Sequence, residues 1–504
     1  MKLPDDIYAD RTAYAADGSV LVFYAKKEGS EKKTGAAVMK DDGTGFRSIY
    51  EGPLEKKLLP YQDNTRILTG DSVLECPAGT TFETCPENSL TRYEIVYPDE
   101  FTKDPEVTRI FSEVIIAPDN VHMAWTMLRK DCGAADAVGS LVKTEKDGKI
   151  VYEVQDARLI SRMNVYHEDP ENPGYLKKEE SLGGEVKQFI HGGKAISLVG
   201  SDANGNSNSV AWDLETGKVT QVTKTPGYDE TTIFSPDEKM GITMTTRFSD
   251  TTNLKILGIC QRPYGDPVQN ITSQVYMYGV TGVRKERKGN IGPALINIAK
   301  SESDPQYMGI DLSSPDDNWV YCSPMSWNND GTKCMWTEET RDKKGCRVQI
   351  AELTGCHPGP VVSAAEFPKI GDYADKDRNV KDISGRIKGK VSGYAEVTRK
   401  TGLLNVKTTE ISYHQYSDDG KTYFDGTEYS SGSVMTSTSY KAQLSVRDAE
   451  GKEIGGMDLN LYFTPAYKLT SAFTGSASPG LDLKKSEGKA FWKDQECDLA
   501  GLVE

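Results

Sequence analysis

The chain has 504 residues, of which 75 are acidic and 60 basic, so its net charge at pH 7 is −15. A net negative surface repels nucleic acid and anionic membranes and argues against both as partners, although a local basic patch would escape this argument. No apolar run approaches the ~18 residues of a membrane span, which excludes an integral membrane protein. The 47 glycines and 25 tyrosines favour a turn-rich β protein.

The N-terminus and the cysteines bear on the compartment. Residues 1–6 lack the apolar core of a secretory signal, so the location stays open: extracellular if a signal has been removed, otherwise cytoplasmic. Two close cysteine pairs, Cys76 with Cys85 and Cys346 with Cys356, suit either disulfide-closed loops or buried free thiols.

A small pattern recurs through the first three quarters of the chain. A tight turn rich in Asp, Asn and Gly precedes a short strand of aromatic and β-branched residues. Asp accepts nearby backbone N–H groups and Gly or Asn tolerates positive φ, so each copy predicts a hairpin. The six copies have their turns at Asp17–Gly18, Asp63–Asn64, Pro118–Asn120, Gly192–Gly193, Pro236–Glu238 and Asp330–Gly331.

Hairpins at irregular spacing predict radial blades with long inserted loops. We therefore expect an all-β chain with a six- or seven-bladed β-propeller over residues 1–375, in which the Ser-Pro-Asp turns resemble those of TolB-type propellers. A large β-sandwich with similar hairpins is the alternative.

The pattern changes near residue 380, where apolar and polar residues begin to alternate strictly. Such alternation is typical of antiparallel strands with one buried and one solvated face. Residues 380–504 are therefore predicted to form a small antiparallel β-sandwich, similar to a jelly roll. The predicted buried set includes Ile387, Val391, Ala395, Val397, Tyr440, Ala442, Leu444, Val446, Met457, Leu459, Leu461 and Phe463.

Loops that gather at one face of a propeller commonly form a ligand funnel. Asp71 follows a predicted strand and could present a carboxylate there, or could simply cap a loop. His122, next to an aromatic wall, could act as a general acid or base, or could be a core histidine between blades. His167, which has more polar neighbours, is a candidate substrate contact.

Arg247 directly follows a predicted inner strand. Its planar guanidinium could clamp a substrate carboxylate, and a salt bridge to Asp250 is an equally good interpretation.

The densest cluster of candidates runs from residue 311 to residue 327. Its acids and tryptophans suit carbohydrate, because aromatic rings stack on sugar faces and paired acids perform glycosidic chemistry. The same oxygens could hold a structural Ca²⁺, although no cofactor is otherwise expected, and an ordered covering loop is the plain alternative. The candidates are Asp311, Asp316, Asp317, Trp319 and Trp327.

Several enzyme signatures are absent. The sequence has no Gly-x-Ser-x-Gly elbow, no Walker loop and no dinucleotide fingerprint, so serine-hydrolase, nucleotide-dependent and Rossmann chemistries lose support.

Stretches spread through both predicted domains resemble the fungal saponin hydrolases. The stretches are Asn64–Asp71, Ala117–Trp125, Phe234–Asp237 with Thr246–Arg247, Asp317–Trp319, Asn329–Lys333, Tyr416–Gly420 and Gly426–Glu428. The resemblance implies a secreted enzyme that releases the sugar chain of a triterpenoid glycoside by cleaving the bond between glucuronic acid and the aglycone. It assigns no catalytic residue.

If the resemblance holds, the partner is a small-molecule glycoside whose carboxylate Arg247 could bind. Asp71, His122, Asp316 and Asp317 are then the candidate catalytic residues, and the separation of two carboxylates would decide between retention and inversion. A uronic-acid lyase acting by β-elimination and a non-catalytic propeller scaffold are the alternatives.

Overall fold

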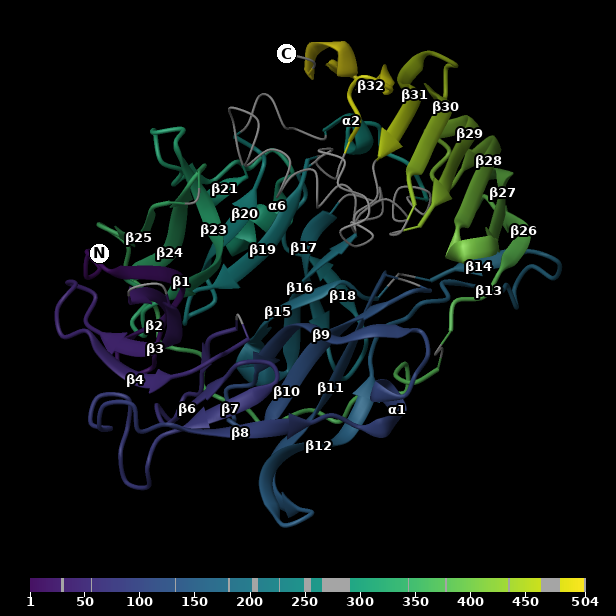
Figure 1. Cartoon of the computed structure of the whole chain (residues 1–504). Coiled ribbons are helices and arrows are strands. Elements are labelled where there is room, and N and C mark those ends of the chain that lie inside the picture. Colours follow the sequence, from purple (N-terminus) through teal and green to yellow (C-terminus); the bar gives the residue numbers. More distant parts are fainter. Residues whose placement is uncertain are drawn as a thin grey trace.

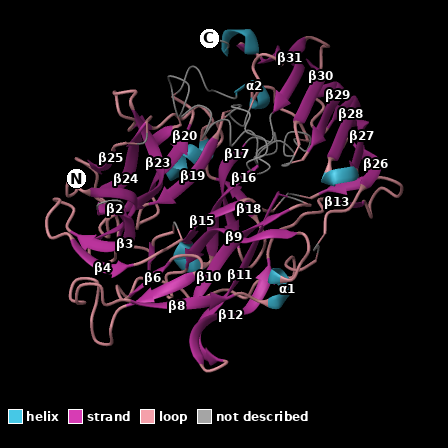
Figure 2. Cartoon of the chain, viewed as in Figure 1, coloured by secondary structure: helices cyan, strands magenta, loops and turns pink. Residues whose placement is uncertain are grey.

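The structure is a computed structural model, and it describes residues 1–502 except 29–30, 56, 132, 180–181, 202–206, 226, 249–254, 265–290, 343, 377–378, 434–435 and 464–480. Strands dominate and the few helices are short (Figure 2). The predicted all-β class is confirmed: six blades form a propeller, and a separate sheet follows it at the C-terminal end (Figure 1).

The first two blades have four strands each. They comprise β1 (Ile7–Tyr14), β2 (Val20–Glu28), β3 (Glu31–Met39) and β4 (Arg47–Glu51), then β5 (Leu59–Pro60), β6 (Arg66–Leu68), β7 (Ser72–Glu75) and β8 (Thr91–Val96).

The third and fourth blades are separated by a small hairpin. They comprise α1 (Asp99–Thr102), β9 (Val107–Ile116), β10 (His122–Arg129), β11 (Gly133–Lys146) and β12 (Lys149–Leu159), the hairpin β13 (Tyr166–Glu168) and β14 (Leu176–Lys178), then β15 (Glu185–Ile190), β16 (Ala195–Ser201), β17 (Ser207–Asp213) and β18 (Val219–Gln221). The outer strands β8 and β12 pair in parallel, which joins the second and third blades into one sheet.

The last two blades carry the longest insertion. They comprise β19 (Asp229–Phe234), β20 (Met240–Thr245), α2 (Lys255–Gly258), β21 (Gly292–Asn297), α6 (Ile298–Ser303) and β22 (Ile310–Asp311), then β23 (Trp319–Trp327), β24 (Lys333–Thr340) and β25 (Cys346–Glu352).

Each of the six predicted turns joins the first strand of a blade to its second. The blade number is therefore six, one blade for each copy of the sequence pattern. The turn carboxylates act as expected: Asp17 accepts from the Ser19 amide at 2.9 Å and Asp330 from the Thr332 amide at 2.9 Å.

The ring is closed by contacts between its two ends. Strand β1 packs on β23, the first strand of the last blade. The Tyr14 amide donates to Ser326 Oγ at 2.9 Å, and the Met1 amine donates to the Val348 carbonyl at 2.8 Å.

The C-terminal strands form one antiparallel sheet in chain order. They are β26 (Ile383–Lys388), β27 (Ser392–Thr401), β28 (Lys407–Ser417), β29 (Thr422–Gly432), β30 (Thr438–Asp448), β31 (Glu453–Phe463), β32 (Glu487–Trp492) and β33 (Gln495–Asp498). The predicted alternation is confirmed in β30 and β31, where every residue of the predicted buried set is buried. Val391 is the exception: it lies in the β26–β27 turn and is 57 % exposed.

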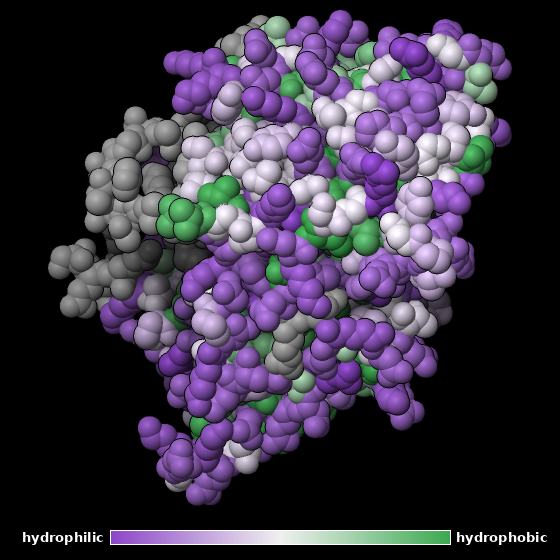
Figure 3. Space-filling model, turned by 90° about the vertical axis from the view of Figure 1, so that its right-hand side faces the viewer, coloured by the Kyte–Doolittle hydropathy of each residue, from purple (hydrophilic) through white to green (hydrophobic). Residues whose placement is uncertain are grey.

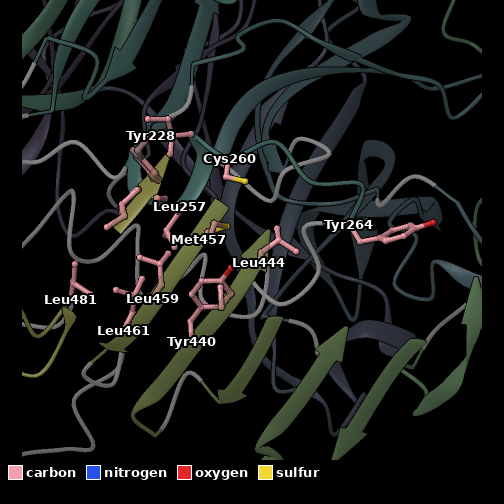
Figure 4. Close-up of a cluster of buried hydrophobic side chains, with 14 of the residues drawn as sticks. Tyr228, Leu257, Cys260, Tyr264, Tyr440, Leu444, Met457, Leu459, Leu461 and Leu481 are labelled. Atoms are coloured by element: carbon pink, nitrogen blue, oxygen red, sulfur yellow. The ribbon is translucent and has the colours of Figure 1, made fainter. Parts of the chain in front are cut away.

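This sheet differs from the predicted sandwich in how its buried face is covered, because its strands do not form two facing sheets. The insertion between β20 and β21 packs against it and supplies Leu257, Ile259 and Cys260 to the same hydrophobic core (Figure 4). Propeller side chains therefore take the place of a second sheet.

A buried ion pair joins the insertion to the sheet. Arg262 Nε lies 2.9 Å from Glu428 Oε1, and both side chains are 0 % exposed. Glu428 also accepts hydrogen bonds from the hydroxyls of Tyr440 at 2.7 Å and Tyr413 at 3.0 Å. Additional hydrogen bonds of this kind help to offset the cost of burying the two charges.

The segment between β25 and β26 runs back beneath the propeller and includes the predicted boundary at residues 375–380. The Gly359 amide binds Asp237, the Ala365 amide binds the Gly192 carbonyl, and the Tyr373 hydroxyl binds the Leu214 carbonyl, at 2.7, 2.9 and 2.9 Å. The segment thus leaves the sixth blade and crosses the fifth and fourth. It brings β26 beside the hairpin β13–β14, where Leu176 contacts Gly385.

Candidate functional site

A cleft of about 1060 Å³ opens between the rim of the propeller and the C-terminal sheet. Its walls come from the hairpin β13–β14, the outer strand β18, the insertion at Pro263 and Tyr264, and the β26–β27 turn with the end of β28. The surface on the side of β26 and the hairpin is mostly hydrophilic, with a few small hydrophobic patches (Figure 3).

The cleft gathers positive charge in a chain that is acidic overall. Six lysines and five carboxylates line it. The Lys388 amine donates to Asn172 at 3.0 Å. Four further lysines have no carboxylate in ion-pair range within the described ranges: Lys177, Lys218, Lys224 and Lys390. A local group of basic residues of this kind is compatible with the negative net charge of the whole chain.

Two of the cleft carboxylates are already engaged. Asp169 accepts from the Glu171 amide at 2.9 Å and from the Asn172 side chain at 2.8 Å, which holds a turn. Glu179 lies 3.4 Å from Arg162 and 3.8 Å from His167. The six lysines exceed the five carboxylates of the lining by one formal charge.

A hydrogen-bonded chain of side chains lies at the floor of the cleft. The hydroxyls of Tyr264 and Tyr416 are 2.8 Å apart, and the Tyr416 hydroxyl donates to Asp418 at 2.8 Å. Burial is the main cause that raises the pKa of Tyr416 far above its usual range, so this hydroxyl keeps its proton. Both tyrosines are buried, whereas Asp418 is exposed.

Apolar side chains complete the lining. Leu176, Val219 and Ile387 contribute carbon surface beside the lysines. The cleft therefore offers apolar carbon surface and ammonium groups side by side.

The central axis of the propeller, where the sequence predicted a ligand funnel, holds a network of paired charges. Lys57 lies 2.7 Å from Glu113, and Lys187 lies 3.9, 2.9 and 3.6 Å from Glu113, Glu185 and Glu230. Burial would raise the pKa of Glu113, but Lys187 and Lys57 outweigh it and hold that pKa below its ordinary value.

Two predicted catalytic residues lie on opposite faces of the propeller. Asp71 lies in the turn between β6 and β7, where it binds Arg92 at 2.6 Å and Ser72 at 2.7 Å. His122 follows the turn between β9 and β10, which antiparallel order places on the other face. Its Nδ1 lies 2.6 Å from Asp119, and its ring stacks on Phe367 at 3.7 Å.

Arg247 is buried and its guanidinium is occupied. It donates to Asp229 at 2.7 Å and to the carbonyls of Tyr307 and Met308 at 3.1 and 3.2 Å. The side chain is 2 % exposed. The ion pair thus has Asp229 as its acid, while Asp250, the partner weighed from sequence, lies outside the described residues.

The acids of the 311–327 cluster are exposed and mostly support local turns. Asp311 accepts from the Ser313 amide at 2.9 Å, Asp316 accepts from the Asn318 amide at 3.0 Å, and the Asp317 carbonyl accepts from Arg341 at 2.6 Å. Among the described residues, no hydrogen bond or ion pair joins Asp71 to Asp316 or Asp317.

The remaining candidates are also separated. Trp319 begins β23 and stacks under Arg347 at 4.2 Å, whereas Trp327 ends the same strand, is buried, and donates to the Ile233 carbonyl at 2.9 Å. His167 lies on the hairpin β13–β14, next to Glu179 of the cleft.

Sequence reasoning missed the cleft residues Tyr264, Lys388 and Lys390 entirely. Tyr416 and Asp418 belong to a stretch that carried the family resemblance, yet no role was assigned to them. That stretch was the sequence signal for both residues, but nothing in it indicated that they line a cavity.

Within the described residues, no three His, Cys, Asp or Glu side chains come together as metal ligands. The described cysteines, including Cys76, Cys85, Cys346 and Cys356, are free thiols. No helix in this part of the chain is long and apolar enough to cross a bilayer.

Comparison with known proteins gives structural neighbours only. No protein-family model matches the chain, and no curated protein matches it. The neighbours include a protein of Agrobacterium tumefaciens assigned as TolB, at 11 % identity, with 62 % of this chain and 82 % of that one covered and a TM-score of 0.35.

Two further neighbours are enzymes. An oligogalacturonate lyase of Vibrio parahaemolyticus is 10 % identical, with 70 % and 92 % of the two chains covered and a TM-score of 0.35. A puromycin-hydrolyzing peptidase of Mycobacterium tuberculosis is 9 % identical, with 78 % of this chain and 58 % of that one covered and a TM-score of 0.33. Nothing in these likenesses points to the fungal saponin hydrolases in particular, and they carry no argument about activity.

Proposed function

We propose that the protein is a glycoside hydrolase that cleaves a glucuronide-type glycoside of a triterpenoid or a similarly apolar small aglycone. The observation that supports this most is the cleft, where six lysines lie beside apolar side chains in a chain of net charge −15. A glucuronide has the matching chemistry, with a carboxylate at one end and carbon surface at the other.

The size of the cleft is compatible with such a ligand. Sites for small molecules commonly measure about 300–1000 Å³, and this cleft reaches about 1060 Å³. Lysine ammonium groups bind carboxylates as charge-assisted donors.

We assign the acid and base chemistry to the cleft and not to Asp71, His122, Asp316 or Asp317, which are engaged elsewhere. Glu302 and Asp418 line the cleft, and neither is in an ion pair among the described residues. Replacing Glu302 with Gln should lower kcat at least about 100-fold, the usual contribution of a general acid or base. Glu450→Gln, at an exposed turn of the C-terminal sheet, should leave kcat unchanged.

The decisive assay incubates the protein with a panel of triterpenoid glucuronides and measures the free aglycone. Release of aglycone together with glucuronic acid is the expected result. An unsaturated sugar that absorbs in the ultraviolet would indicate β-elimination, so the protein would be a lyase. Binding without any product would favour the non-catalytic alternative.

A further inference from the structure

The hydrogen bonds at the cleft floor have a fixed direction. An ionised carboxylate can only accept, so the Tyr416 hydroxyl must give its single hydrogen to Asp418, 2.8 Å away. In the 2.8 Å contact between Tyr264 and Tyr416, Tyr264 must then be the donor. Both hydroxyl dipoles therefore point toward Asp418 and hold one of its oxygens in place.

The other Asp418 oxygen is tied to the turn that presents two lysines. It accepts from the Lys390 amide at 3.0 Å. The same turn is fixed by the Val391 amide on the Ser417 carbonyl at 3.0 Å and by the Gly389 amide on the Gly393 carbonyl at 3.0 Å. The stems of Lys388 and Lys390 thus start from backbone that is locked beside Asp418.

We infer that Asp418 contacts the ligand and recognises a sugar hydroxyl, while Lys388 and Lys390 bind a carboxylate next to it. A carboxylate can accept about four hydrogen bonds. The exposed Asp418 carboxylate accepts two within the described structure, so it can accept more from a ligand. The inference rests on the proposed function, which places a uronic acid in this cleft.

Such an arrangement selects for two groups at once. A neutral sugar gains no charge–charge attraction from the lysines. A carboxylate without hydroxyls is repelled by the charge of Asp418 and donates no hydrogen bond to it. Only a ligand with both groups, such as a uronic acid, satisfies the lysines and Asp418 together.

The test compares three probes, glucuronate, glucose and cyclohexanecarboxylate, by the Kd of each in an NMR titration of the whole chain. The wild type should bind glucuronate at least tenfold more tightly than either other probe. In Asp418→Ala the affinity for glucuronate should fall about tenfold, while that for cyclohexanecarboxylate should rise about threefold because a repulsive charge is gone.

The opposite signs separate recognition from electrostatics. If Asp418→Ala raises the affinity for both anions, Asp418 only repels them and the inference is overturned. Asp458→Ala, an exposed acid on the outer face of β31, is the matched control and should change neither Kd. Replacing both Lys388 and Lys390 with Met should lower the affinity for both anions and leave the affinity for glucose unchanged.

Tyr416 is a positioning residue, and Tyr416→Phe isolates that role. The affinity for glucuronate should fall about threefold with cyclohexanecarboxylate unaffected, whereas a merely structural loss would weaken both. Failure of the proposed function can be told apart from failure of the inference. If the protein shows the predicted Kd pattern but releases no aglycone, the inference about Asp418 stands and the hydrolase proposal is wrong. Wild type that binds no glucuronate overturns both.

Discussion

The central axis of the propeller and the cleft at its rim are both lined with charged side chains, but the charges are arranged differently. At the axis, Lys187 lies within 3.9 Å of three glutamates and is only 7 % exposed. In the cleft, four lysines have no ion-pair partner among the described residues.

The difference bears on which region is the better candidate for binding a charged ligand. Charges that are paired and partly buried have already exchanged water for one another, so a ligand can gain little from them. Unpaired, hydrated lysines keep their attraction for an anion. The axis therefore holds the blades together, and the cleft is the better site.

The largest expected effect is at the axis. Replacing Lys187 with Met leaves three glutamates without that cation, and breaking a buried pair in this way costs about 4 kcal/mol of unfolding free energy. Urea denaturation followed by circular dichroism measures the loss. Lys177→Met, in the cleft, is the matched control and should lose less than about 0.5 kcal/mol. Similar losses in the two variants would remove the contrast between the regions.

A buried carboxylate without a cation sharpens the comparison. Burial raises the pKa of Asp136 to about 7, although Thr126, Gly184 and Ser161 all donate to it. Between pH 4 and pH 7 the folded chain then keeps a proton that the unfolded chain has released. The stability that this group contributes is full below pH 4 and is lost as pH rises toward 7, by on the order of 4 kcal/mol.

Asp136→Asn tests this, because an amide does not titrate. The difference in unfolding free energy between wild type and variant should change by that amount across the window, as measured by urea denaturation at several pH values. Parallel curves would mean that Asp136 is ionised in the folded chain.

The smallest effect belongs to the cleft. Lys177→Met combined with Lys224→Met should weaken glucuronate binding about fivefold, since exposed charge pairs contribute about 0.2–1 kcal/mol each. The Kd from calorimetry at low salt measures it, and added salt should shrink the difference. The paired control Lys441→Met, on the outer face of β30, should leave the Kd unchanged. A similar loss for a neutral glycoside would show that charge is not the cause.

The sequence was a good guide to the fold wherever a short stretch decides the backbone. The six turns at Asp17–Gly18 through Asp330–Gly331 were predicted correctly, because Asp, Asn and Gly act on their own neighbours in the chain. They left the blade number at six or seven, and the structure has six. The alternation from Tyr440 to Val446 gave the buried face of β30. Val391 did not follow its alternation, because a turn interrupts the strand there.

The site was predicted less well. Arg247 has the residue type and the strand-end position of a clamp, yet its partner Asp229 occupies the guanidinium. That pairing joins two strands of one blade, and no sequence pattern of Arg247 indicates it. Lys388 and Lys390 read as polar residues of an alternating strand, with nothing to show that a hairpin from residue 166 onward would face them.

The sequence by itself determined the all-β class, the hairpin turns, the six repeats and the solvated face of each C-terminal strand, since these depend on interactions between near neighbours. The tertiary structure alone decided what covers the C-terminal sheet, where the chain returns beneath the blades, and which charges meet. Those features depend on contacts between residues more than a hundred positions apart, such as Arg262 with Glu428 and Tyr264 with Tyr416. The cleft likewise depends on tertiary contacts, because it lies where β26 packs against the hairpin β13–β14.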